Sequence, residues 1–178
     1  MPFQPPQPLA ERHVIAGFDC GDASLNQWLQ QRALANQRSG ATRTFVVCDA
    51  DGVVKAYAAL ASGAIAVAAS PGRFRRNMPN PIPVVVLARL AVCRSVQGQG
   101  IARALLADVF ERVLWASDHI GVRGIVVHAA SLAARSFYLR MGFDPSPTDP
   151  NTLMLRFSDV EAAMKPQDSQ SGNSAAER

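Results

Sequence analysis

The 178-residue sequence has few of the residues that build disulfide frameworks or metal sites. It contains three cysteines and three histidines, and both sets are scattered along the chain: Cys20, Cys48, Cys93, His13, His119 and His128. An odd number of cysteines without a Cys-x-x-Cys pair is typical of free thiols in a reducing compartment. The dispersed histidines would be hard to gather around a metal ion, so we expect no metal site.

Long apolar runs and leader features are also lacking. Hydrophobic residues make up 48% of the chain, but no stretch is long and apolar enough to span a bilayer. The apolar run 58–69 contains Ser62 and Gly63, and we interpret it as a buried strand. The first residues carry neither the basic region nor the apolar region of a secretory signal. We therefore expect a cytoplasmic protein with no membrane partner.

Acidic residues are missing from the middle of the chain. None occurs between Asp51 and Asp108, although this section contains Lys55, Arg73, Arg75, Arg76, Arg89, Arg94 and Arg103. A purely basic central section suits a polyanionic partner, either coenzyme A or nucleic acid. For any single arginine, simple solvation is the alternative.

The chain length fits one domain with a terminal segment on each side. Residues 1–12 are proline-rich and predict an extended or poorly ordered lead-in, and residues 165–178 predict a disordered tail. Between them, residues 13–164 predict a helix ending at Ser39–Gly40, a hairpin turning at Asp51–Gly52, two strand–helix units and a last strand over 151–157. This order indicates an α/β fold with a mixed sheet and helices on both of its faces.

Residues 70–83 interrupt the pattern with several prolines and a basic cluster around one aromatic residue. An exposed loop with Arg73, Arg75 and Arg76 could contact phosphates. Phe74 is either available for stacking on a base or packed into the core.

The most informative stretch is a strand over Leu87–Val92, a turn with Gly98 and Gly100, and a helix from Ile101. Unpaired N–H groups and the positive end of the helix dipole make such a turn an anion site. No Gly-Lys-Ser/Thr follows, which excludes a Walker A loop, and Arg103 stands where a dinucleotide fingerprint needs a small residue. The remaining pattern is Gln97-x-x-Gly100-x-Ala102.

This pattern resembles the pyrophosphate loop of the GNAT N-acetyltransferases, which bind acetyl-coenzyme A. A second segment, Ala134-x-x-Phe137-Tyr138-x-x-x-Gly142-Phe143, is similar to another signature of that superfamily. The resemblance implies the GNAT fold, with a mostly antiparallel central sheet, and acetyl-coenzyme A as cosubstrate without a metal. It further implies these cofactor-binding residues: Leu90, Ala91, Val92, Gln97, Gly98, Gln99, Gly100, Ile101, Ala102, Arg103 and Phe137.

Tyr138 is the catalytic candidate of the second segment. Acetyl transfer to an amine expels a thiolate, and a phenol within hydrogen-bond distance can stabilise or protonate it. The alternative is that Tyr138 only lines the core beside Phe137.

Three stretches, 18–29, 87–92 and 142–147, resemble the acetyltransferase toxins of type II toxin–antitoxin pairs. The resemblance implies acetylation of the α-amino group of aminoacyl-tRNA, which blocks translation. It also implies a homodimer and a ribbon-helix-helix antitoxin that binds operator DNA. Candidates for holding the tRNA are Arg73, Arg75, Arg76, Arg89 and Lys55.

The residues also bear on the acceptor. An α-amino group titrates near pH 8, so part of it is already neutral and nucleophilic, and the acid-free section offers no obvious Glu or Asp base. This favours an α-amine over a lysine side chain. An N-acetyltransferase for a small amine or a protein amine, and a non-catalytic acetyl-coenzyme A sensor, are the alternatives.

Overall fold

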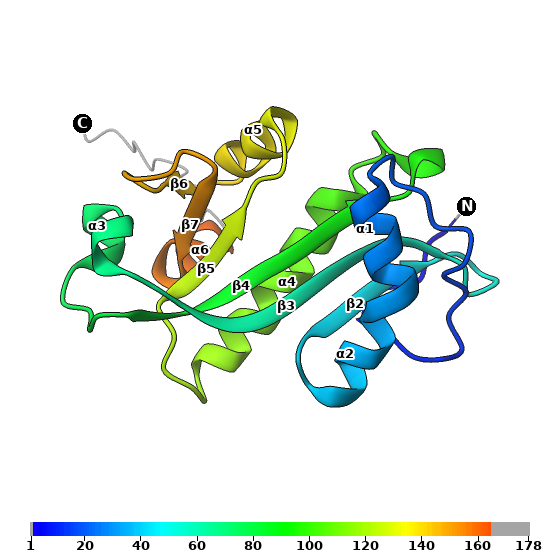
Figure 1. Cartoon of the computed structure of the whole chain (residues 1–178), viewed down its shortest axis with the longest axis horizontal. Helices are drawn as coiled ribbons and strands as arrows, with labels where there is room; N and C mark the ends of the chain where they lie inside the picture. The colour runs from blue at the N-terminus through cyan, green and yellow to red at the C-terminus, as the bar shows by residue number, and fades with distance from the viewer. Residues whose placement is uncertain (1, 165–178) are drawn as a thin grey trace, which may run out of the picture.

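The structure is a computed structural model that describes residues 2–164, so the predicted disordered tail at 165–178 lies outside the described residues. In the described part, one sheet has the strand order β1-β2-β3-β4-β5-β7-β6, and only the β4–β5 pair is parallel (Figure 1). The strands are β1 Gln7–Pro8, β2 Arg43–Cys48, β3 Val54–Ile65, β4 Ile82–Val92, β5 Gly124–His128, β6 Asp144–Pro145 and β7 Thr152–Arg156. The predicted mixed, mostly antiparallel sheet is confirmed.

Helices cover both faces of the sheet, as expected. The helical elements are α1 Ala23–Trp28, η1 Leu29–Ala33, α2 Leu34–Ser39, η2 Val67–Ala69, α3 Gly72–Arg75, η3 Arg94–Val96, α4 Ile101–Ser117, α5 Leu132–Arg140 and α6 Phe157–Met164. The first face, which we call the α4 face, carries α4, α5 and α6 around one core that includes Leu87, Leu105 and Leu153. The opposite face, the α1 face, carries α1–α2 over Tyr57 and α3 over Val126.

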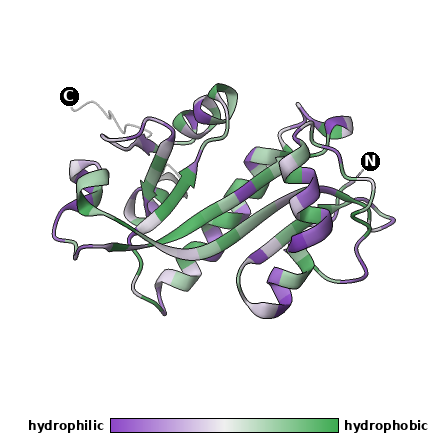
Figure 2. Cartoon of the chain, in the orientation of Figure 1, coloured by the Kyte–Doolittle hydropathy of each residue, from purple (hydrophilic) through white to green (hydrophobic). Residues whose placement is uncertain are grey.

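Side-chain alternation explains this two-sided burial. In β5, Ile125 and Val127 pack with α4, whereas Val126 packs with α3. Figure 2 shows the central strands as largely hydrophobic and the polar residues gathered on helices and loops. Apolar runs buried on both faces are what a parallel strand pair between two helical layers requires.

Several turns follow directly from their sequence. Asp22 caps α1 by accepting hydrogen bonds from the N–H groups of Ser24 and Leu25. Gly40 ends α2 with φ +79°, the left-handed conformation that glycine adopts at little cost. The Asp51–Gly52 turn joins β2 and β3, as its sequence predicted.

The structure corrects the prediction at three places. The apolar run 58–69 is not one buried strand. β3 ends at Ile65, and the residues Ser62–Ala64 near its end are exposed. β2 pairs with β3 only as far as Leu60, so among the described strands the rest of β3 has a neighbour on one side alone. The chain also turns into α6 at Phe157, where the sequence predicted only a strand.

The third departure is in the predicted basic loop, part of which is helical. The structure also decides the character of the lead-in. Residues 72–75 form the short helix α3, and Phe74 is buried with an exposed fraction of 2%, which decides its role in favour of the core. The lead-in is extended, but it is ordered: Gln7 and Pro8 pair with β2, and Leu9 is buried.

Candidate active site

Strands β4 and β5 pair over a short stretch and then separate. The parallel ladder joins Val85–Leu87 to Ile125–Val127, whereas β4 continues along β3 as far as Val92. A β-bulge lies at the point of divergence, because Leu60 pairs with Leu87 and Ala59 with Arg89, which leaves Ala88 as the extra residue. Within the described chain, the edge of β4 over 88–92 that faces β5 therefore has no strand partner.

A cavity of about 550 Å³ occupies the space between the separating strands; we call it the cleft. Its wall contains the end of β4, the start of α1, the end of β5 and one side of α5. The cleft brings together six residues that the sequence predicted for the site: Arg89, Leu90, Ala91, Val92, Gln97 and Tyr138. Phe137 is not among its lining residues and packs against Tyr138 and the α4-face core.

The glycine turn leads from the cleft to the start of α4. Gly98 and Gly100 both have φ +78°, and a Cβ built on either would meet no atom within 4 Å, so the space above them is open. Among the described residues, the backbone N–H groups of 98–103 have no backbone acceptor, and the first helical bond is donated by Ala104 to Gly100. This cluster of donors at the positive end of a long helix suits a diphosphate.

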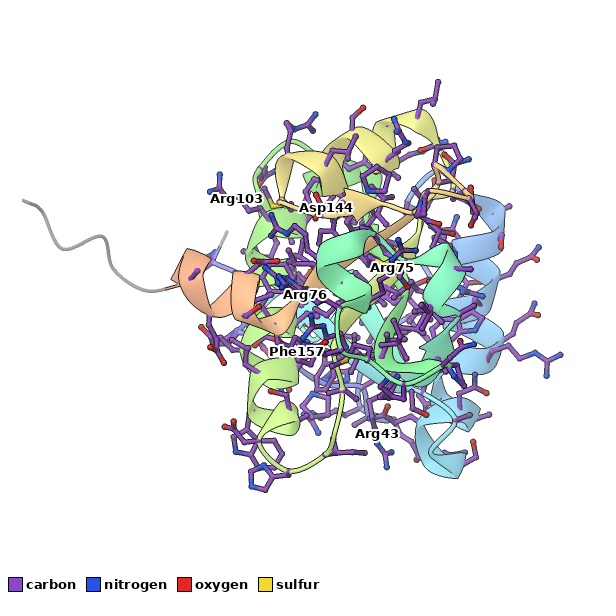
Figure 3. The ribbon with its side chains drawn as sticks, turned by 90° about the vertical axis from the view of Figure 1, so that its left-hand side faces the viewer. Arg43, Arg75, Arg76, Arg103, Asp144 and Phe157 are labelled. Carbon is purple, nitrogen blue, oxygen red and sulfur yellow. The ribbon has the colours of Figure 1, made fainter. Side chains whose placement is uncertain are left out.

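The other predicted residues of the turn differ in what their side chains contact. The side-chain amide of Gln97 donates to the carbonyl oxygens of Cys20 (3.0 Å) and Val92 (2.9 Å), so it ties the turn to β4 and to the segment before α1. Arg103 is exposed on the first turn of α4 and extends outward in Figure 3. Gln99 is exposed, and Ile101 packs into the α4-face core.

Tyr138 lies at the inner end of the cleft. Its ring packs edge-on against Phe137 and Phe143, and only 6% of the residue is exposed. Burial raises the pKa of Tyr138 far above its ordinary value, so the hydroxyl stays protonated and can donate a proton or a hydrogen bond. No hydrogen bond from a described residue engages this hydroxyl.

Arg89 lies on the α1 face of the cleft. Its guanidinium carbon is 5.2 Å from the centre of the Trp28 ring, which in turn stacks on Tyr57 at 5.9 Å. Arg89 also donates to the carbonyl oxygen of Ala88 (2.8 Å). Among the described residues no acid pairs with Arg89, so its charge is available to a ligand.

The other predicted basic residues lie elsewhere. Arg73, Arg75 and Arg76 belong to or follow α3, at the end of the molecule that faces the viewer in Figure 3. Lys55 lies at the opposite end of β3 and pairs with Asp49 at 3.3 Å. The structure thus separates Lys55 from the arginines of the loop.

An open hollow of about 810 Å³ beside α3 contains a cluster that the sequence prediction missed in part. We call it the arginine hollow, and its charged residues are Arg73, Arg76, Arg123, Arg156 and Asp159. Asp159 accepts from Arg156 (2.9 and 2.8 Å) and pairs with Arg73 (2.8 Å), while Arg123 donates to the carbonyl oxygens of Phe74 and Arg73. One carboxylate among several guanidinium groups leaves a net positive charge, and burial lowers the pKa of Arg123.

A further hollow, of about 770 Å³, lies between β2–β4 and α4 and is mostly apolar. Trp115 and Ile120 at its border are 69% and 60% exposed. The cleft contains Tyr138, the catalytic candidate that the signature motifs identified, so we assign the chemistry to the cleft despite its smaller volume.

Neither a metal-binding cluster nor a membrane-spanning helix is found in residues 2–164. Within residues 2–164, no three His, Cys, Asp or Glu side chains come close enough together to bind a metal ion. In the same part of the chain, no helix combines the length and the apolar character needed to cross a membrane.

Comparison with known proteins agrees with this geometry. The sequence model of the Acetyltransferase (GNAT) domain family matches residues 40–145. A tRNA-acetylating toxin of Mycobacterium tuberculosis is 46% identical over 160 residues, which cover 90% of this chain and 96% of the relative.

Solved structures give the same result. AtaT complexed with acetyl-methionyl-tRNAfMet is 29% identical with a TM-score of 0.85, and the match covers 92% of this chain and all of AtaT (100%). A tyrosine-to-phenylalanine mutant of the AtaT toxin, bound to acetyl-CoA and to the C-terminus of the antitoxin AtaR, is 26% identical with a TM-score of 0.78. That match covers 92% of this chain and 99% of the other. From the cleft, the glycine turn and these matches together, we conclude that the chain belongs to the GNAT family of acetyltransferases.

Proposed function

We propose that the protein is a toxin of a type II toxin–antitoxin system that transfers the acetyl group of acetyl-coenzyme A to the α-amino group of aminoacyl-tRNA. The observation that carries this proposal is the cleft, in which Tyr138 faces the unpaired edge of β4 beside the donors of the glycine turn. The 46% identity to a tRNA-acetylating toxin supports the choice of acceptor.

The residues present fit acetyl-coenzyme A. The N–H groups of 98–103 would hold the pyrophosphate, and the lack of a side chain at Gly98 and Gly100 leaves the space for it. The unpaired edge of β4 at Leu90–Val92 would pair with the amide groups of the pantetheine arm, as a neighbouring strand would. In this arrangement Ala102 and Arg103 contribute backbone N–H groups, and Phe137 supports Tyr138 from behind.

Tyr138 would act on the leaving group. When the amine attacks the thioester carbonyl and the carbon–sulfur bond breaks, the protonated phenol donates its proton to the departing thiolate. Burial keeps that proton in place until a strong base forms beside it.

The basic residues would hold the tRNA by its phosphates. Arg89 is at the cleft and suits the 3′ end, whereas Arg73, Arg75 and Arg76 lie on the same α1 face near the arginine hollow. Lys55 lies apart from this group and is already paired, so its contribution is the weakest of the predicted set. Because several basic residues would contact phosphates, the affinity for tRNA should depend strongly on the salt concentration.

The proposal includes an antitoxin, operator DNA and a second copy of the chain as partners. The proposed partner is a ribbon-helix-helix antitoxin that recruits operator DNA. The solved AtaT–AtaR complex bound to DNA supports an antitoxin and a DNA contact. The exposed Trp115 and Ile120 beside an apolar hollow support a homodimer. The proposed substrate implies action in the cytoplasm.

The test is incubation of purified protein with labelled acetyl-coenzyme A and bulk tRNA, charged and uncharged in parallel. We expect label only on charged tRNA, recovered as N-acetyl-aminoacyl ends. The Tyr138→Phe protein prepared in the same way controls for contaminating enzymes. Label on a protein or a small amine, with none on charged tRNA, would support the alternative acetyltransferase.

A further inference from the structure

A hydrogen-bonded network of His128, Thr152 and Asp149 ends at the cleft. His128 Nδ1 lies 2.8 Å from Thr152 Oγ1, and that hydroxyl donates to Asp149 Oδ2 at 2.7 Å. His128 and Thr152 are directly opposite each other in the β5–β7 ladder, which fixes their separation. Asp149 also accepts from the N–H of Asn151 (3.0 Å), so its own position is fixed.

This hydrogen-bonded network determines which ring nitrogen of His128 carries the proton. The hydrogen bonds from Thr152 and Asn151 lower the pKa of Asp149, so this carboxylate is ionised and can only accept. The single hydroxyl hydrogen of Thr152 is therefore directed to Asp149, and Thr152 must accept from His128 Nδ1–H. The neutral imidazole then presents an unprotonated Nε2, which has no hydrogen-bond partner among the described residues.

His128 is exposed and lines the same cleft as Tyr138 and Arg89. Strand alternation places it with Val126 and Arg89 on the α1 face, whereas Tyr138 belongs to the α4-face core. The two residues thus border the cleft from opposite faces of the sheet, the arrangement needed for one proton acceptor and one proton donor. The titratable and charged groups around His128 are Arg89 of β4, Cys20 and Asp22 before α1, Tyr138 and Arg135 of α5, and Asp149.

We propose that His128 is a catalytic residue that takes a proton from the α-ammonium group of the aminoacyl acceptor before it attacks. This rests on the proposed acetyl transfer to aminoacyl-tRNA. Nε2 removes the proton and leaves a neutral amine, while the Thr152–Asp149 pair stabilises the imidazolium that forms. The amine nitrogen then bonds to the acetyl carbon, the carbon–sulfur bond breaks, and the thiolate takes the Tyr138 proton. The amide nitrogen loses its second proton to restore the phenol, and His128 returns its proton to water. One proton is released per turnover.

The test compares wild-type protein with His128→Gln over a range of pH. Glutamine can still donate a hydrogen bond to Thr152 but cannot accept a proton. The variant must therefore rely on the neutral fraction of the amine, which is roughly 3% at pH 6.5 and about 90% at pH 9 for an amine that titrates near pH 8. We expect kcat to fall by about tenfold or more at pH 6.5 and by less than about twofold at pH 9.

Two controls separate catalysis from structure. Acetyl-coenzyme A affinity of His128→Gln, measured by calorimetry, should match the wild type and shows that the cleft is intact. Thr152→Val should produce a smaller loss with the same pH trend, and Thr152→Ser, which keeps the hydroxyl, should recover the rate.

Either of two results would overturn the role of His128: a wild-type to variant ratio that stays constant from pH 6.5 to pH 9, or an increase in KM alone. The second result would make His128 a binding residue for the tRNA end. Failure of the wild type to acetylate charged tRNA would instead refute the proposed function, so the two failures are distinguishable.

Discussion

The guanidinium group of Arg89, on β4, lies over the ring of Trp28, on α1. The aromatic face holds the arginine in one orientation at the border of the cleft, and no described acid neutralises it. A fixed, uncompensated cation at this position suits the negatively charged 3′ end of a tRNA.

Replacing Arg89 by Met keeps the length of the side chain and removes its charge. We expect kcat/KM for aminoacyl-tRNA to fall by about 10- to 150-fold, since one charge-assisted phosphate contact contributes roughly 1.5–3 kcal/mol. Acetyl-coenzyme A affinity should be unchanged. Arg43→Met, an exposed position on β2 away from the cleft, is the matched control, and an equal loss in both variants would refute a specific role for Arg89.

Tyr138→Phe removes only the hydroxyl that faces the cleft. Because no described residue bonds to this hydroxyl, thermal stability and acetyl-coenzyme A affinity should remain those of the wild type. The rate of acetyl transfer should fall by about 10²- to 10⁴-fold, the range of a lost general acid. Single-turnover kinetics measure this directly, and full turnover in the variant would exclude Tyr138 as the acid.

The glycine turn can be tested with a pair of variants at one position. Gly100→Asp and Gly100→Asn introduce side chains of the same size at φ +78°, a conformation that both residues tolerate better than most. They differ in charge, so only the aspartate should repel a pyrophosphate. We expect calorimetry to give an acetyl-coenzyme A affinity at least about tenfold weaker for Gly100→Asp than for Gly100→Asn. Equal affinities would place the pyrophosphate elsewhere.

Charge reversal at α3 tests the proposed tRNA surface. Arg76→Glu should raise KM for aminoacyl-tRNA several-fold and reduce the salt dependence of binding, while acetyl-coenzyme A affinity is retained. The double variant Arg75→Glu/Arg76→Glu should enlarge the effect. Arg12→Glu, an equal charge change near the other end of the molecule, is the control and should leave tRNA binding unaffected.

Asp159 joins α6 to β7 and α3 through Arg156 and Arg73. The hydrogen bonds from Arg156, and then those from Arg73, lower the pKa of Asp159 below its unfolded value of 3.8. The stabilisation is therefore present above about pH 4 and is lost as the pH falls through the lower folded value. We expect Asp159→Asn to reduce the free energy of unfolding by about 1–2 kcal/mol at pH 7, measured by urea denaturation.

As the pH falls from about 4 through the lower folded pKa, the same substitution should cost progressively less, because the carboxyl group of the wild type is then protonated and uncharged. A destabilisation that is independent of pH would mean that Asp159 acts by packing and not by its ion pairs.

Local signals account for what the sequence predicted. Gly40, Gly52 and Gly100 have positive φ angles, and turns of this kind depend on a few adjacent residues. The helix from Ile101 and the segment ending in Gly142 have strong local patterns too, and the resemblance of the two motifs to GNAT signatures gave the predicted roles of Tyr138 and of the glycine turn. The start of α6 was missed because the apolar residues of β7 continue into Phe157 and Val160 without a glycine or proline between them.

The rest of the site depends on contacts between distant residues. Arg123 and Arg156 come next to α3 only when β5 and β7 pair, and Gly124 lies opposite Arg156 in that ladder. His128 meets Thr152 through the same register, 24 positions along the chain. Nothing in the sequence around His128 indicates this contact, because it depends on the pairing of β5 with β7.

The short β4–β5 ladder also has a consequence for the lifetime of the protein. Within residues 2–164, only Val85–Leu87 and Ile125–Val127 connect the two halves of the sheet by strand pairing. Acetyl-coenzyme A, bound along the free edge of β4, would act as the missing strand and raise the free energy of unfolding by about 2.7 kcal/mol at a hundred times its dissociation constant. The amide hydrogens of 88–92 that point to the free edge of β4, and not to β3, should then exchange slowly with solvent only when the cosubstrate is abundant. The metabolic supply of acetyl groups would thereby set how long each molecule survives proteolysis, in addition to how fast it works.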